Sequence, residues 1–293
     1  MSERPAPGSR PTESKGRREP RPPGDRAKGR GVRRPPLRLM TTTLWEYPSQ
    51  HYDAYVLDGK VHKSQSPGRQ GDQAYQGATP SWVIWQLLVR YTREKDLVVD
   101  PMCGSGTTLD VARDLGRRGL GYDLAPSRPD IFRADARSLP LEDEVVDFYF
   151  VDPPYSTHIT YSDDPRCIGK LDAAPDSETG GQAYYDAMAA VFREAYRVLR
   201  PRRYMAVYVS DSWRKRRGPA GEGGGVFMPI GFELFGILRT MLRPIDIIAV
   251  VRHNDKLRRG NWHKAAEEGN FFLRGFNYLM IFRKMGPARS GKA

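Results

Sequence analysis

Short apolar runs alternate with amphipathic stretches from residue 97 to residue 282. The seven apolar runs that predict buried strands are 97–100, 119–123, 131–134, 146–151, 204–209, 245–251 and 278–282. The amphipathic stretches predict helices over 107–115, 183–199 and 232–242. Strands that alternate with helices form a mostly parallel sheet covered on both faces. The pattern therefore predicts an α/β fold with a doubly wound, mostly parallel, seven-stranded sheet.

A further helix precedes the first strand. Thr79 and Pro80 form a helix start signal, with Thr at the N-cap and Pro at the first helical position. Its buried side would be supplied by Trp82, Val83, Trp85, Leu87 and Leu88.

The first 39 residues differ in composition from the rest. They are rich in Pro, Arg and Gly, and they hold 12 Arg and Lys against 4 Asp and Glu, which is +8 of the net charge of +12. Such a segment cannot bury enough apolar surface to offset its ordering entropy, so we expect 1–39 to be disordered. A basic arm on nucleic-acid phosphates and a solvated leader both fit it. The folded domain is expected over 40–285, with a short tail at 286–293.

Several classes of protein are excluded. No apolar run approaches the roughly 18 residues of a membrane helix, and no apolar leader opens the chain. The two cysteines, Cys103 and Cys167, form no CxxC pair, so neither a metal site nor a disulfide framework is indicated. A cytoplasmic location is expected.

The first chemical signal is a glycine-rich turn between a strand and a helix, Asp100-Pro-Met-Cys-Gly-Ser-Gly-Thr-Thr108. Gly104 and Gly106 lack Cβ and allow backbone to approach a ligand closely. Ligands in doubly wound sheets bind beyond the carboxyl ends of the strands, which is where this turn lies. The sequence is not a Walker loop, because no Gly-Lys-Ser/Thr follows.

Two acids end the next strands. Asp123 could accept hydrogen bonds from the hydroxyls of a ribose, or serve as a cap. Asp135 could face the amino group of a bound adenine, or be a plain turn residue.

The strongest signal is the run of 146–151 into Asp152-Pro153-Pro154-Tyr155. The two prolines end the strand and stiffen the backbone. The carboxylate of Asp152 and the carbonyl of Pro153 could then accept both hydrogens of an NH2 group. An exocyclic amine is a poor nucleophile while its lone pair is delocalised into the ring, and accepting its hydrogens makes that pair available. Tyr155 offers a flat face for a base.

These motifs resemble the amino-methyltransferases of DNA that modify adenine N6 or cytosine N4. DPMCGSGTT resembles the cofactor motif of that family, with Met102 where Phe is usual, and VDPPY resembles its catalytic motif. TPSWVIWQLLVRYT resembles the helix that completes the pocket. The resemblance implies a Rossmann-like class I methyltransferase sheet with a final antiparallel strand, and S-adenosylmethionine as cofactor.

The same resemblance assigns roles to residues. The cofactor would contact Thr79, Pro80, Asp100, Met102, Gly104, Gly106, Thr107, Asp123 and Asp135. The catalytic set would be Asp152, Pro153, Pro154 and Tyr155, which hold a base flipped out of the duplex. Asp at the first position of the catalytic motif favours adenine N6 over cytosine N4 in this family.

No recognition domain fits between the two motifs, so recognition is expected from 156–182, 211–229 and 252–276. The candidate nucleic-acid contacts there are Tyr161, Arg166, Arg214, Lys215, Arg216, Arg217, Arg258, Arg259 and Trp262. Each could equally be a solvated charge or a buried aromatic. DNA is the expected partner, with a companion restriction endonuclease as a further expectation. An RNA substrate read by shape and a non-catalytic nucleic-acid-binding protein remain alternatives.

Overall fold

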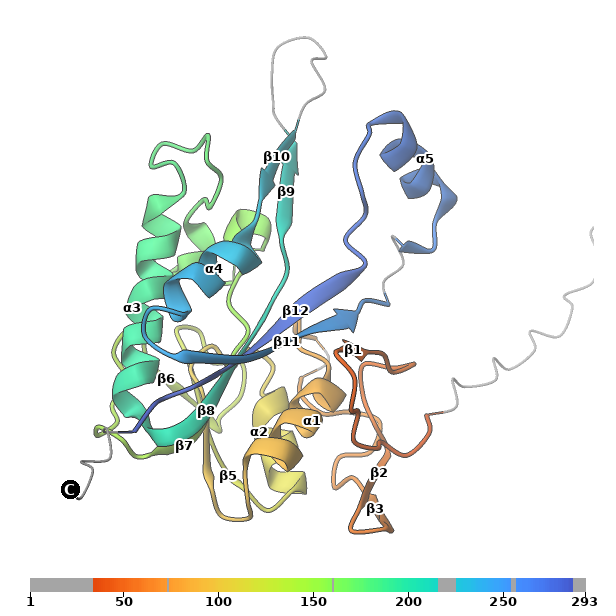
Figure 1. Ribbon diagram of the computed structural model, residues 1–293, viewed down its shortest axis with the longest axis vertical. Coiled ribbons are helices and arrows are strands. Elements are labelled where there is room, and N and C mark those ends of the chain that lie inside the picture. Colours follow the sequence, from red (N-terminus) through yellow and green to blue (C-terminus); the bar gives the residue numbers. More distant parts are fainter. Residues whose placement is uncertain (1–33, 73, 160, 216–224, 254–256, 287–293) are drawn as a thin grey trace, which may run out of the picture. The chain divides into compact units, whose positions relative to one another are not determined.

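The computed structural model describes residues 34–72, 74–159, 161–215, 225–253 and 257–286, without the side chains of 214 and 215. Its main sheet has eight strands in the order β1-β11-β12-β8-β7-β4-β5-β6 (Figure 1). The strands are β1 (Leu44–Trp45), β4 (Leu97–Asp100), β5 (Arg118–Asp123), β6 (Ile131–Arg133), β7 (Val146–Val151), β8 (Leu199–Val209), β11 (Arg243–Val251) and β12 (Phe276–Arg283).

All neighbouring pairs in this sheet are parallel except those of β12, which is antiparallel to both β11 and β8. The α/β class, the mostly parallel sheet and the final antiparallel strand are thereby confirmed. The count of seven strands was wrong, because β1 adds an eighth at the edge beside β11. A two-residue strand shows no alternation of its own, so the pattern could not reveal it.

Helices cover both faces of the sheet (Figure 1). The helices are α1 (Ser81–Tyr91), α2 (Thr107–Asp114), α3 (Gln182–Val198), α4 (Ile230–Leu238) and α5 (Gly260–Glu268). One apolar core includes α3, α4 and the side chains of Tyr149 and Val151, and the other includes α1, α2 and the side chains of Phe148 and Phe150. Because successive side chains of β7 point to opposite faces, this fully buried strand contributes to both cores.

The folded unit begins at Arg34, earlier than the boundary expected between 39 and 40. Leu37 is only 1% exposed and forms a β-bridge to Tyr55. Gln86 of α1 accepts a hydrogen bond from the Met40 backbone N–H and donates one to the Arg38 carbonyl. A single apolar side chain among basic and proline residues gave no periodic signal. The expected disorder of 1–33 lies outside the described residues.

Two of the three expected recognition loops contain regular structure. Within 211–229, β9 (Ser212–Lys215) and β10 (Gly225–Met228) form an antiparallel pair. Within 252–276 lies α5. Among its described residues, segment 156–182 contains the 3-10 turns η1 (Ser156–His158) and η2 (Ile168–Lys170) and ends at the first residue of α3. A separate hairpin, β2 (Ala54–Leu57) and β3 (Lys60–Lys63), precedes α1 and was not predicted either.

Candidate active site

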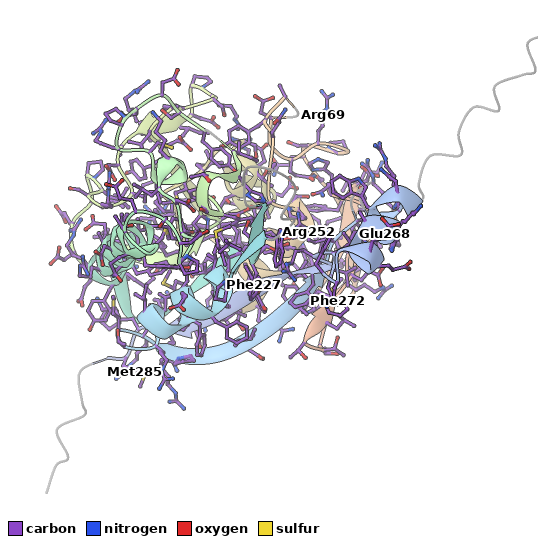
Figure 2. All side chains as sticks on the ribbon, turned by 90° about the horizontal axis from the view of Figure 1, so that it is seen from above. Arg69, Phe227, Arg252, Glu268, Phe272 and Met285 are labelled. Carbon is purple, nitrogen blue, oxygen red and sulfur yellow. The ribbon has the colours of Figure 1, made fainter. Side chains whose placement is uncertain are left out.

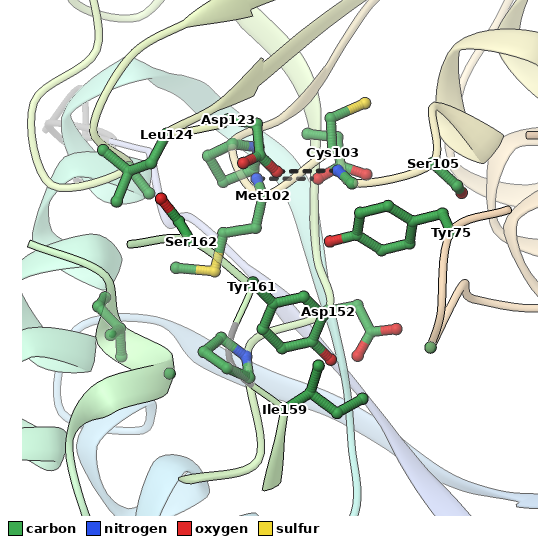
Figure 3. A pocket seen from close by; sticks show the side chains of 18 of the residues that line it. Tyr75, Met102, Cys103, Ser105, Asp123, Leu124, Asp152, Ile159, Tyr161 and Ser162 are labelled. Carbon is green, nitrogen blue, oxygen red and sulfur yellow. Dashed lines mark hydrogen bonds between the residues drawn. The ribbon is translucent and has the colours of Figure 1, made fainter. Parts of the chain in front are cut away.

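The central strands bring three carboxylates to one edge of the sheet. β4 lies between β5 and β7, and these parallel strands end at Asp100, Asp123 and Val151, which Asp152 follows. A cavity of about 240 Å³ opens at this edge, and all three acids line it (Figure 3). The predicted cofactor residues in its wall are Thr79, Asp100, Met102, Gly104, Thr107, Asp123 and Asp135. Pro80 lines a second cavity instead, and Gly106 lines neither.

The glycine turn needs both of its glycines, although its neighbours are the protein's own side chains. Gly104 has a φ of +47° and Gly106 a φ of +78°, which other residues rarely adopt. A Cβ on Gly104 would lie 2.7 Å from the ring of Tyr75, and one on Gly106 would lie 2.6 Å from a guanidinium nitrogen of Arg128. The close approach predicted for a ligand is made in this structure by Tyr75 and Arg128.

Asp100 is a buried carboxyl at the base of the cavity, with 4% of its surface exposed. It accepts hydrogen bonds from the Thr108 hydroxyl at 2.6 Å and from the Met102 N–H at 3.1 Å. Burial raises the pKa of Asp100 to about 7, against these two hydrogen bonds, and the charge of Asp123 adds to the rise. The group therefore exchanges its proton close to neutral pH.

The carboxylates of Asp123 and Asp135 accept hydrogen bonds from different groups of the protein. Asp123 accepts the backbone N–H groups of Gly104 at 3.0 Å and Ala125 at 2.9 Å, and burial still raises its pKa. Asp135 is paired with Arg137 at 2.9 and 2.7 Å. Burial would raise the pKa of Asp135, but the hydrogen bonds and charge of Arg137 outweigh it and lower the pKa. A ligand amino group at Asp135 would have to share this carboxylate with Arg137.

The Asp152 carboxyl is bound on both oxygens by hydroxyl groups. Thr79 donates to one oxygen at 2.5 Å, and Tyr155 donates to the other at 2.8 Å. Burial raises the pKa of Asp152 to about 7, with a further rise from Asp100 and a reduction from Arg252. The N-cap assigned to Thr79 was wrong: Pro80 takes that position without a side-chain cap, because the Thr79 hydroxyl is used on Asp152.

The carbonyls of the two prolines after β7 differ in whether they accept a hydrogen bond from the protein. The Pro154 carbonyl accepts hydrogen bonds from the Tyr184 hydroxyl at 2.8 Å and from the Ser156 N–H at 3.1 Å. No described group donates to the Pro153 carbonyl. It therefore keeps its capacity to accept a hydrogen bond from a ligand, as the sequence argument required.

A second cavity, of about 370 Å³, meets the first at the predicted catalytic motif. Asp152 and Tyr155 line both cavities, as does Arg252. The other walls of the second cavity come from residues 47–50, from α1 and from the ends of β8, β11 and β12, and they include Tyr47, Trp82, Tyr208 and Asn277. Arg258, between β11 and α5, also lines it. The Asp152 carboxylate thus stands where two ligands could approach each other from separate cavities.

Three site residues escaped the sequence analysis. Asn277 donates from Nδ2 to the Tyr155 hydroxyl at 3.2 Å, and its Oδ1 is buried without a hydrogen-bond partner among the described atoms. Arg252 and Tyr75 line the cavities. The only available signal was Asn277, a polar residue on a buried strand. Arg252 and Tyr75 lie in segments without periodicity, so nothing marked them.

The predicted nucleic-acid contacts are dispersed. Tyr161 and Arg166 line the first cavity and Arg258 the second, whereas Trp262 lies on α5 and Arg259 is its N-cap, outside both walls. Arg214 and Lys215 lie on β9, and Arg216 and Arg217 lie outside the described residues.

Segments 211–229 and 252–276 contact each other. Trp213 stacks on Phe271 at 6.1 Å, and Arg274 lies over the ring of Phe227 at 4.8 Å. Phe227 and Phe272, both labelled in Figure 2, are 41% and 84% exposed. The two segments therefore form one surface that carries exposed aromatic side chains.

Among the described residues no group of three or more His, Cys, Asp or Glu is placed to hold a metal ion. Cys103 and Cys167 are both buried and unpaired by disulfide. No helix of the described part is long and apolar enough to cross a membrane.

Comparison with known proteins supports the cofactor half of this site. Residues 15–133 match the family model of the DNA methylases. This part of the chain is similar to the DNA methylase family. This finding confirms the resemblance to the DNA amino-methyltransferases, and it covers the glycine turn and Asp123. The DNA methylase match ends before Asp152, so the roles assigned to 152–155 rest on their own geometry.

Curated relatives are similar to this chain over limited lengths. A type II methyltransferase of Lactococcus lactis subsp. cremoris, M2.LlaDCHI, is 33% identical over 97 residues, 28% of this chain and 36% of the relative. M.MthZI of Methanothermobacter thermautotrophicus, also a type II methyltransferase, is 28% identical over 111 residues, 38% of this chain and 31% of the relative. The chain thus spans about a third of the length of these relatives.

A solved structure was also found. An S-adenosylmethionine-dependent methyltransferase of Methanosarcina mazei is 15% identical and matches 68% of this chain and 97% of its own, with a TM-score of 0.41. That score is too low to bear on the fold, which follows from the strand order of the chain itself.

Proposed function

We propose that this protein transfers a methyl group from S-adenosylmethionine to the exocyclic amino group of a base in DNA, with adenine N6 favoured and cytosine N4 next. The observation that carries the proposal is the position of Asp152 and Tyr155 at the junction of two cavities. A methyl donor and a methyl acceptor must meet at one point from separate sites, and this junction provides such a point. The DNA methylase match supports DNA as the polymer.

The hydrogen-bond acceptors that line the first cavity suit S-adenosylmethionine. Asp123 keeps acceptor capacity for ribose hydroxyls beyond the two N–H groups that it binds. Asp100 and the glycine turn would hold the methionine end, and Asp135 would face the adenine. The bound cofactor supplies an electrophilic methyl group at a cationic sulfonium. The chain's own contribution is to position and desolvate the two reactants.

Asp152 and the Pro153 carbonyl would hold the target amine. The amine N–H groups would donate to these two acceptors, and the nitrogen lone pair would then point away from both. Only the ionised carboxyl serves fully as an acceptor, and the pKa of Asp152 is about 7. Tyr155 would stack on the base, while its hydroxyl, held between Asp152 and Asn277, fixes the tilt of its ring.

Sequence recognition would come from the surface formed by segments 211–229 and 252–276. The exposed aromatic side chains and Arg274 offer stacking and phosphate contacts. The absence of a separate recognition domain between the motifs fits a short DNA site. We also propose a companion restriction endonuclease, since the curated relatives are named type II methyltransferases.

The test is mass spectrometry of nucleosides. The full chain and isotopically labelled S-adenosylmethionine are incubated with duplex DNA and, separately, with total RNA, and the products are digested. Label in the deoxynucleoside of N6-methyladenine or of N4-methylcytosine from DNA, lost in Asp152→Ala, is the expected result. Label from RNA alone would overturn the DNA substrate while keeping the chemistry. Transfer that survives Asp152→Ala would contradict the role of the carboxylate.

A further inference from the structure

Two tyrosine rings face each other inside the first cavity. The rings of Tyr75 and Tyr161 lie 6.1 Å apart at an interplanar angle of 19°. Figure 3 shows Tyr75 above and to the right of Tyr161, with Asp123 above both rings and Asp152 beside Tyr161. Tyr75 comes from the segment before α1, and Tyr161 comes from the segment between η1 and η2. Neither ring belongs to the motifs that the family resemblance assigns.

Tyr75 is held in place by the glycine turn. The Asp72 N–H donates to the Ser105 carbonyl at 2.8 Å, and the Gly71 N–H donates to the Asp110 carboxylate at 2.8 Å. These bonds tie the Tyr75 segment to the turn and to α2. The ring rests directly on Gly104, where any Cβ would collide with it at 2.7 Å. These hydrogen bonds, together with the lack of a Cβ at Gly104, fix the position of the Tyr75 ring.

The surroundings of the rings are acidic. The pKa of Tyr75 is raised well above its usual range, first by burial and then by the charges of Asp123, Tyr161, Asp152 and Asp100. Its hydroxyl stays neutral, and the carboxyls of Asp100, Asp123 and Asp152 line the same cavity. Among the described residues of this wall, the arginines are Arg166, paired with Asp164, and Arg252 at the junction. A cavity walled by carboxyls and aromatic faces suits a cation.

Given the proposed function, we propose that Tyr75, backed by Tyr161, binds the sulfonium of S-adenosylmethionine through the face of its ring. The electron-rich face of an aromatic ring attracts a cation. Methyl transfer turns the sulfonium into the neutral thioether of S-adenosylhomocysteine, and this attraction then disappears. Tyr75 thus favours the substrate form of the cofactor over the product form and assists product release.

The experiment measures binding rather than turnover. Calorimetry gives the Kd of S-adenosylmethionine and of S-adenosylhomocysteine for the full-length wild type, Tyr75→Phe and Tyr75→Leu. Tyr75→Leu is expected to weaken S-adenosylmethionine about tenfold and S-adenosylhomocysteine far less, since a desolvated cation–π contact contributes to that extent. Tyr75→Phe keeps the ring and should keep the ratio of the two Kd values. Tyr196→Leu, on the partly exposed face of α3, is the matched control.

Equal weakening of both ligands by Tyr75→Leu, or tighter binding of either, would overturn the role of Tyr75 and leave the proposed function standing. A wild type that binds neither ligand would overturn both. Thermal melting shows whether each variant is folded. If Tyr75→Leu is not folded, Tyr161→Leu tests the same ratio: a selective loss of S-adenosylmethionine supports the aromatic wall, and an unchanged ratio overturns it.

Discussion

Replacing Asp152 by Asn should make the protein more stable at high pH while impairing transfer. The carboxyl has a pKa of about 7 in the folded protein, against a reference value of 3.8. The folded state therefore binds a proton more tightly than the unfolded state. Between about pH 4 and pH 7 the folded state holds more protons, so stability falls as pH rises and becomes level above pH 7. Asn cannot ionise and removes this contribution.

The size of the effect follows from the two pKa values. One carboxyl that shifts from 3.8 to about 7 disfavours the folded state by about 2 kcal/mol at pH 5 and about 4 kcal/mol at pH 8. The stability of Asp152→Asn relative to wild type should therefore increase by about 2–3 kcal/mol between these pH values. Asp100 has a similar pKa, but it is present in both proteins and largely cancels.

The assay is urea unfolding of both proteins at intervals from pH 5 to pH 8. Asp58→Asn, at an exposed position in the turn between β2 and β3, controls for the general effect of removing a charge. A difference between Asp152→Asn and wild type that stays constant or shrinks as pH rises would show that Asp152 is already ionised in the folded protein at pH 5. Burial would then not raise the pKa of this carboxyl.

Three further predictions follow from the packing. Asn277→Leu should leave the melting temperature within a few degrees of the wild type, because it removes a buried oxygen without a partner. It should nevertheless lower kcat about tenfold, because the Tyr155 hydroxyl loses the hydrogen bond from Asn277. An unchanged kcat would show that Asn277 does not position Tyr155. Gly106→Ala should lower the free energy of unfolding, measured with urea, by about 1–3 kcal/mol, because its φ is +78° and its Cβ would lie 2.6 Å from Arg128. Gly236→Ala, on α4 with open space around it, is the control and should not lower the free energy of unfolding. Leu37→Ala should lower the free energy of unfolding by about 2–4 kcal/mol, since this side chain is 1% exposed. The same change at Leu39, which is 47% exposed, is the control and should have little effect. Equal effects of the two changes would show that the folded domain begins at residue 40.

The fold followed from local pattern wherever an element was long enough to show its period. The Val146–Val151 and Leu97–Asp100 strands lie where the apolar runs placed them, because strands buried on both faces are mostly apolar. The exceptions are Asp100, at the end of its strand, and Asp147, which pairs with Arg200 and Arg203. The α3 helix also matched, within one residue at each end. The sequence pattern did not predict the β1 strand or the β9–β10 pair, since two to four residues give too little alternation of apolar and polar side chains.

The sequence by itself determined the chemistry that the site can hold. It placed Asp100, Asp123 and Asp152 after parallel strands, and the carboxyl ends of such strands meet at one edge of the sheet. Only the tertiary structure decided what surrounds these acids. Thr79 donates to Asp152 and Asn277 donates to the Tyr155 hydroxyl, while Tyr75 and Arg252 line the cavities. All four come from segments that are distant along the chain from the motifs. Contacts of that kind depend on how elements pack, and no local period or spacing encodes them.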